Sequence, residues 1–176
     1  KLCAALDKSV CEVEFRQQER AQLLRWVKRR FAAAGHDIDD ATADHLLFTC
    51  GSLMTELVPE IGKIAAYAKG RAVTVEDINA VADPVLDARV FDMTNSITAG
   101  KYDQAAQVLG ELLRMQTEPI VILAAVGKEL RRLYTARMAL DAGKDRFWLK
   151  QLWSMSSEYP AKLFMQASGK LDHELA

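Results

Sequence analysis

The sequence predicts an all-α protein built from two small helical bundles in series. Of the 176 residues, 50% are hydrophobic and 27% are charged, which is a globular composition. From residue 16 onward, apolar side chains recur every three or four residues, the period of a helix that buries one face. Glycines, prolines and capping residues divide this pattern into short segments, and Asp83-Pro84 separates two groups of them. No repeat occurs often enough to indicate a solenoid.

Residues 1–15 are the one stretch with a different period. Cys11, Val13 and Phe15 alternate with two glutamates, which is typical of a strand with one buried face. A lone strand cannot satisfy its backbone hydrogen bonds, and no later segment alternates in this way. We therefore expect residues 1–15 to be a short strand remnant, the tail of a preceding domain, and the chain to be a piece of a longer one.

Four helices are expected in the first bundle, residues 16–84. The first covers residues 16–34. The second begins at an N-cap supplied by Asp39 or Asp40 and ends near Gly51, because short acidic side chains cap helix starts and glycine favours helix ends.

The third and fourth helices of this bundle have their own boundary signals. The third should run from a Ser52 cap to Ala68, with a kink or local break at Pro59. The segment TVED, from Thr74 to Asp77, has the pattern of a capping box and should start a short helix that ends before Pro84.

Five helices are expected in the second bundle, residues 86–176. The longest should begin at Glu118-Pro119 and reach about Ala142, with the proline in the first turn. In this helix and the one before it, the apolar spacing predicts inward-facing side chains at Ala106, Leu109, Leu112, Leu113, Ile122, Val126, Leu130, Leu133 and Leu140.

Composition and motifs exclude several classes of protein. The net charge is -1, and the longest apolar run, residues 120–126, is too short to cross a bilayer. Cys3, Cys11 and Cys50 lack the CxxC spacing of metal or redox sites and indicate reduced thiols in a cytoplasmic protein. Because no nucleotide-binding, hydrolase or zinc motif occurs, we expect no catalytic residue, no cofactor and no metal.

Two clusters of cations are the candidate contacts with nucleic acid or a partner. One lies on the first helix and the other lies on the longest helix, roughly opposite its expected apolar stripe. Such ridges bind phosphates in some proteins and are merely solvated in others. The candidate residues are Arg25, Arg29, Lys128, Arg131 and Arg132.

The order of these signals resembles the delta subunits of the bacterial DNA polymerase III clamp loader. The resemblance covers nearly the whole chain, and Tyr159-Pro160 opens a helix of that family as well. Four stretches carry most of it: LLRWVKRRFAAAGHDIDDATADHLLFTCG from residue 23, SLMTELVPEIGKIAAYAKGRAVTVEDI from residue 52, VFDMTNSITAGKYDQAAQVLGELL from residue 90 and EPIVILAAVGKELRRLYTARMALDAG from residue 118.

The resemblance implies a role and a division of the chain. Residues 1–15 would end an AAA+-like domain, residues 16–84 would be its helical lid, and residues 86–176 would be most of a collar that lacks its last helix. The subunit would help to open and load the sliding clamp without hydrolysing ATP, and the lid and collar would move as rigid units about Asp83-Pro84.

The resemblance also implies partners. The collar would join the ATPase subunits and the delta-prime subunit, the missing N-terminal domain would grip the clamp, and the complex would bind primer–template DNA away from any membrane. Two other functions stay open from the residues alone, a helical adaptor and a DNA-binding regulator that uses the cations of the first helix.

Overall fold

The computed structural model describes residues 18–169, and every regular element within that range is a helix. The all-α prediction is therefore confirmed for the described part of the chain, whereas the strand predicted at residues 1–15 lies outside it. The helices are α2 (Arg20–Ala33), α3 (Asp40–Cys50), α4 (Met54–Ala68), α5 (Val75–Val81), α6 (Leu86–Thr98), α7 (Tyr102–Arg114), α8 (Pro119–Asp141), α9 (Arg146–Leu152) and α10 (Tyr159–Ser168).

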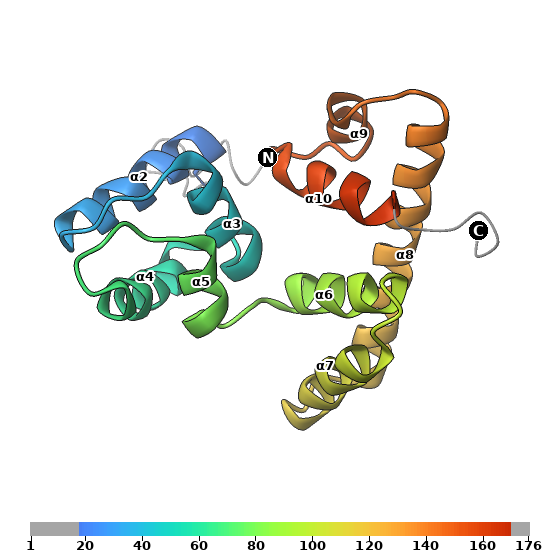
Figure 1. Cartoon of the computed structure of the whole chain (residues 1–176), viewed down its shortest axis with the longest axis horizontal. Coiled ribbons are helices and arrows are strands. Elements are labelled where there is room, and N and C mark those ends of the chain that lie inside the picture. The colour runs from blue at the N-terminus through green and yellow to red at the C-terminus, as the bar shows by residue number, and fades with distance from the viewer. Residues whose placement is uncertain (1–17, 170–176) are drawn as a thin grey trace, which may run out of the picture.

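Helices α2 to α5 form an N-terminal bundle around one hydrophobic core (Figure 1). Leu23, Val27 and Phe31 of α2 meet side chains of the other three helices in this core, and Phe31 is fully buried. The spacing of these three residues, four apart, gives α2 a single apolar face that packs inward.

Of the three N-caps that the sequence predicts in the N-terminal bundle, two are present in the structure. The Asp39 side chain accepts a hydrogen bond from Thr42 N at 2.6 Å and caps α3. Thr74 and Asp77 form the predicted capping box at the start of α5. The prediction of a Ser52 cap was wrong, because α4 begins at Met54 with Leu53 in the capping position and no side-chain cap.

Helix α4 runs through Pro59 without interruption. Proline removes the hydrogen bond to the carbonyl four residues earlier, which here belongs to Thr55 near the start of the helix. The local break that the sequence allowed at this residue does not occur.

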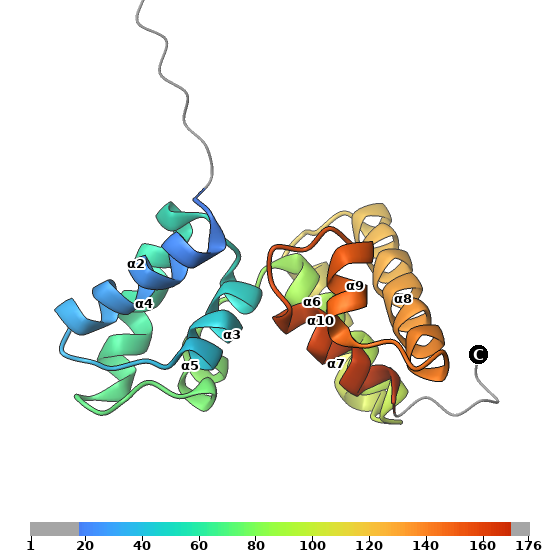
Figure 2. The ribbon, with the colours of Figure 1, turned by 90° about the horizontal axis from the view of Figure 1, so that it is seen from above.

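Helices α6 to α10 form a C-terminal bundle organised along α8 (Figures 1 and 2). Helices α6 and α7 pack together near the start of α8, and α10 packs near its other end. The bundle has two separate cores, one including Val90, Leu112 and Ile122, the other including Leu133 and Phe164.

The predicted inward faces of α7 and α8 were partly wrong. Ala106, Leu109 and Leu113 of α7 are exposed, and so is Leu130 of α8. Each helix is apolar on two sides, but only one side meets another helix within residues 18–169. The buried side of α8 is made of Ile122, Ala125, Glu129, Leu133, Ala136 and Ala139.

The two bundles meet where α3 lies against α6 and α10. The ring of Phe48 makes edge-to-face contacts with Phe91 at 5.4 Å and with Tyr159 at 6.0 Å between centroids. Val85 N donates a hydrogen bond to the Thr49 carbonyl at 2.8 Å, which attaches the connecting segment to α3.

Candidate functional site

Within residues 18–169, no group of three or more His, Cys, Asp or Glu side chains is placed to hold a metal ion. No helix in that range is long and apolar enough to span a membrane. Cys50 is buried, and desolvation raises the pKa of its thiol to about 12, so the thiolate that would act as a nucleophile is suppressed. The candidate functional regions are therefore surfaces.

The predicted basic ridge of α8 is largely neutralised by acids of the same bundle. The Lys128 ammonium forms an ion pair with Asp87 of α6. Arg132 pairs with Glu129 at 3.2 Å, and its guanidinium lies 5.8 Å from the centre of the Phe164 ring. Arg131 is the remaining member, and its side chain is exposed.

Glu129 explains why Arg132 turns inward. The glutamate side chain is only 2% exposed, and one of its oxygens has no hydrogen-bond partner among the described residues. Desolvation raises its pKa, and the nearby Arg132 charge opposes that rise. Arg132 therefore compensates a buried carboxylate and is not presented to a ligand.

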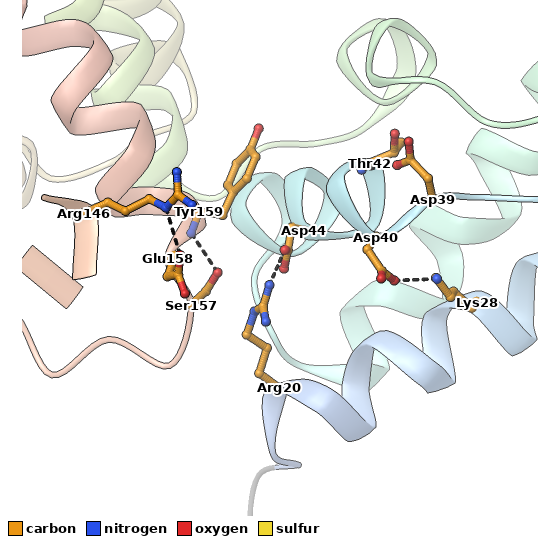
Figure 3. Close-up of polar contacts among 10 residues, drawn as sticks. All are labelled: Arg20, Lys28, Asp39, Asp40, Thr42, Asp44, Arg146, Ser157, Glu158 and Tyr159. Atoms are coloured by element: carbon orange, nitrogen blue, oxygen red, sulfur yellow. Dashed lines mark hydrogen bonds and ion pairs between the residues drawn. The ribbon is translucent and has the colours of Figure 1, made fainter. Parts of the chain in front are cut away.

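The cations of α2 are arranged differently. Lys28 pairs with Asp40 and Arg20 pairs with Asp44, both on α3 (Figure 3). Arg25 and Arg29 are exposed and have no acidic partner in the described part of the chain. Of the five candidate residues, Arg25, Arg29 and Arg131 thus keep their charges available.

A surface that the sequence analysis missed lies on α8. Five large apolar side chains of this helix are between 47% and 69% exposed, although a single apolar face would have sufficed for packing. Their spacing of three, seven, four and four residues places them on one side of the helix, away from the buried side. We call this set the α8 stripe: Ile120, Leu123, Leu130, Tyr134 and Met138.

Gly127 lies in the middle of the α8 stripe. It occupies the position between Leu123 and Leu130 where a heptad-like spacing would place another apolar side chain. A glycine inside a helix costs about 1 kcal/mol relative to alanine, but it lets another backbone approach closely. The signal available in the sequence was this second apolar row, which a search for one stripe per helix overlooks.

The joint between the bundles contains a polar contact at its edge. The Asn79 Oδ1 oxygen lies 2.7 Å from Nε2 of His45, and the Tyr159 hydroxyl lies 2.9 Å from Nδ1. In the neutral ring, Nε2–H donates to Asn79 and Nδ1 accepts from Tyr159. His45 thus links α3 and α5 of one bundle to α10 of the other.

A cavity of about 370 Å³ opens beside this joint. Arg20 and Asp44 lie on one side, and Ser157 and Pro160 lie on the other (Figure 3 labels the first three). Ser157 accepts a hydrogen bond from Tyr159 N at 3.0 Å, and Arg20 pairs with Asp44. Arg20 Nε is buried and has no hydrogen-bond partner among the described residues, so the ion pair with Asp44 satisfies this guanidinium only in part.

Three comparisons with known proteins bear on this architecture. The family model described as DNA polymerase III delta subunit, C-terminal domain, matches residues 87–175. The DNA polymerase III subunit delta of Bacillus subtilis is 21% identical over 164 residues, or 93% of this chain and 46% of that protein. The probable DNA polymerase III subunit delta of Aquifex aeolicus is 23% identical over 128 residues, or 72% of this chain and 37% of that protein.

The fold has a solved counterpart. The Bacillus subtilis DNA clamp loader delta protein matches 99% of this chain with a TM-score of 0.63 and 20% sequence identity, and the match covers 52% of that chain. The present chain thus spans about half the length of that structure and less than half of the two curated relatives. Because the family model covers just over half of the sequence, the chain belongs to the family of DNA polymerase III delta subunits, through their C-terminal domain.

Proposed function

We propose that this chain is the assembly part of a clamp-loader delta subunit, which helps to place the sliding clamp on DNA during replication. Membership of the delta family and the names of the relatives support this role. In this proposal, residues 16–84 are a helical lid and residues 86–176 are a collar that joins the subunit to its neighbours.

The α8 stripe is the observation that carries the assembly role. Contiguous apolar side chains on the surface of a soluble domain mark interaction sites. Ile120, Leu123 and Leu130 make few contacts with the rest of this chain, because the buried side of α8 already provides the contacts to α6 and α10. A helix from another subunit that lies along α8 would cover them, and it would also contact the Arg131 guanidinium that lies over Gly127.

The proposed role is structural, within a complex that catalyses DNA synthesis. The chain would contribute neither an ATPase site nor a polymerase site, and nucleotide hydrolysis would belong to the ATPase subunits. The proposed partners are those ATPase subunits and delta-prime through the collar, the sliding clamp through an N-terminal domain, and primer–template DNA. The complex would work in the cytoplasm.

Association of the full-length protein with the ATPase subunits and delta-prime tests this role. We expect the double variant Leu123→Asp/Leu130→Asp to weaken association by about 30-fold or more, since truncating central interface residues costs about 1–3 kcal/mol each. Size-exclusion chromatography and surface plasmon resonance measure the loss.

The control is Thr135→Asp, which adds to α8, outside the α8 stripe, one of the two negative charges that the double variant adds. It should leave association unchanged. If the wild-type protein binds neither the ATPase subunits nor the clamp, the clamp-loader role is wrong. If the double variant associates with the other subunits as tightly as wild type does, the α8 stripe is not the assembly face.

A further inference from the structure

We propose that the outer face of α2 is a binding groove for the phosphate backbone of nucleic acid. This inference does not depend on the assembly role of the α8 stripe, because the two surfaces lie in different bundles. The groove has a volume of about 650 Å³. Its lining contains no acidic side chain and consists of Gln18, Gln22, Arg25, Trp26, Lys28, Arg29 and Met54.

The position of the groove follows from the packing of α2. Leu23, Val27 and Phe31 fix the inward face of this helix. Gln22, Arg25 and Arg29 follow at spacings of three and four residues on the opposite side, so packing holds them in one outward row. The row from Gln22 to Arg29 extends about 10 Å along the axis. One strand of B-form DNA presents about three phosphates over that length.

The charged residues of α2 are all of one sign. The helix has five cationic residues and no acidic one. Three of the five already have partners, since Arg20 and Lys28 pair with acids of α3 and Arg30 lies 5.4 Å from the centre of the Trp26 ring.

Arg25 and Arg29 are the two that remain. Arg25 Nε donates to the Ala21 carbonyl at 3.2 Å, which orients the side chain and leaves its terminal nitrogens outward. Arg29 has no partner among residues 18–169. Terminal guanidinium nitrogens in this state can form bidentate hydrogen bonds to phosphate.

The remaining lining suits an extended chain of phosphates. Trp26 is half-buried, packs against the core of the N-terminal bundle with the Arg30 guanidinium over its ring, and forms a wall of the groove beside the two free arginines. Gln18 and Gln22 add amide donors for phosphate oxygens. The basic ridge of α8 lacks this combination, because Asp87 and Glu129 occupy two of its three cations.

Fluorescence anisotropy with the 176-residue chain tests the groove. The probes are a fluorescein-labelled 20-nucleotide single strand and the matching duplex, each titrated over a series of salt concentrations. We expect Arg25→Gln/Arg29→Gln to lower affinity about 10-fold or more at low salt and to reduce the slope of log K against log salt by about 2, one for each lost phosphate contact.

The control variant is Arg114→Gln/Lys144→Gln, which removes the same charge from the other bundle. Arg114 makes the same kind of contact as Arg25, since its Nε donates to the Gly110 carbonyl at 3.2 Å, and Lys144 is exposed like Arg29. This variant should retain wild-type affinity and slope. Arg25→Lys/Arg29→Lys should keep the slope and lose part of the affinity, because lysine cannot bind phosphate bidentately.

Three results would overturn the inference. The first is that wild type binds neither probe. The second is an equal loss in the Arg25/Arg29 and Arg114/Lys144 glutamine variants, which would show that only net charge matters. The third is displacement of the DNA by poly-L-glutamate at equal charge concentration, which would assign the groove to an acidic protein partner.

Discussion

The core clusters of the two bundles have equal numbers of buried residues but are arranged differently. The N-terminal bundle has fourteen buried residues in one cluster, and the C-terminal bundle has fourteen divided between two clusters. Six of the latter are alanines, compared with three in the N-terminal core. Seventeen large apolar side chains are exposed among residues 18–169, three in the N-terminal bundle and fourteen in the C-terminal one.

The two bundles orient their large apolar side chains differently. In the N-terminal bundle they point inward and form a self-contained core. In the C-terminal bundle, alanines let α8 and α10 pack closely, and many larger side chains of α7, α8 and α9 point outward. Burial of these side chains requires contacts beyond those formed within residues 18–169.

The largest expected effect is on the core of the N-terminal bundle. Phe31→Ala should lower the free energy of unfolding by about 3–5 kcal/mol, because it leaves a cavity at a fully buried site. Hydrogen exchange by mass spectrometry should show lost protection in α2 to α5 and retained protection in α8 and α10. Tyr67→Ala, at an exposed site of α4, should change stability little. Equal loss of protection throughout would show that the bundles unfold as one unit.

A smaller effect is expected at the start of α5. Asp77 accepts hydrogen bonds from Thr74 N and from Arg71, and the Arg71 guanidinium is the main cause that holds its pKa well below the usual range. Asp77→Asn should therefore cost about 1–2 kcal/mol at pH 7.

The pH dependence of this cost has a definite sign. Because the pKa of Asp77 is lower in the folded state, its stabilisation is present above the unfolded value of about 3.9 and is lost as the pH falls below it. The difference between Asp77→Asn and wild type should shrink below pH 4 in denaturant titrations. The matched control is Asp103→Asn, which makes the same substitution in the exposed first turn of α7. A difference that stays constant with pH contradicts the prediction.

Glu129 should behave in the opposite way in the C-terminal bundle. Its pKa is raised by desolvation, so wild type loses stability as the pH rises from the unfolded pKa toward the folded one. Glu129→Gln should match wild type near pH 4 and be more stable at pH 7, by on the order of 1 kcal/mol. Thermal unfolding at the two pH values measures this change, and a less stable variant at pH 7 would show that the Arg132 pair outweighs desolvation.

The smallest effect is expected at the joint. A double-mutant cycle of His45→Ala and Tyr159→Phe should give a coupling of about 0.5–1 kcal/mol, since one hydrogen bond connects the two side chains across the bundles. Asn79→Ala combined with Tyr159→Phe is the control, because Asn79 contacts His45 and not the hydroxyl. Additive effects of His45→Ala and Tyr159→Phe would mean that this bond does not couple the bundles.

The structural features that the sequence predicted correctly are helix starts, which depend on residues close together in the sequence. The Asp39 cap and the Thr74–Asp77 capping box depend on residues three apart, so a local pattern is sufficient. The outward turn of Leu130 was missed because α8 is apolar on two sides, and periodicity does not say which side has a partner.

Contacts between distant residues explain the rest of what was missed at the candidate surfaces. Lys128 and Asp87 are 41 residues apart, and His45 and Tyr159 are 114 apart. Spacing could show that α2 and α8 are both basic, but only the packing of the helices decides which cations already have acidic partners.

The segment that connects the bundles is short and is held at both ends. Asp83 N donates to the Glu60 side chain at 3.1 Å, and Lys63 bridges Glu60 and Asp83, while Val85 is bonded to Thr49. Because Glu60 and Lys63 belong to α4 and Thr49 belongs to α3, these contacts fix the connector against the N-terminal bundle. A rotation of the C-terminal bundle would therefore begin after Val85 and not at Asp83-Pro84, and it would also have to break the contacts of Phe48 and His45 across the joint.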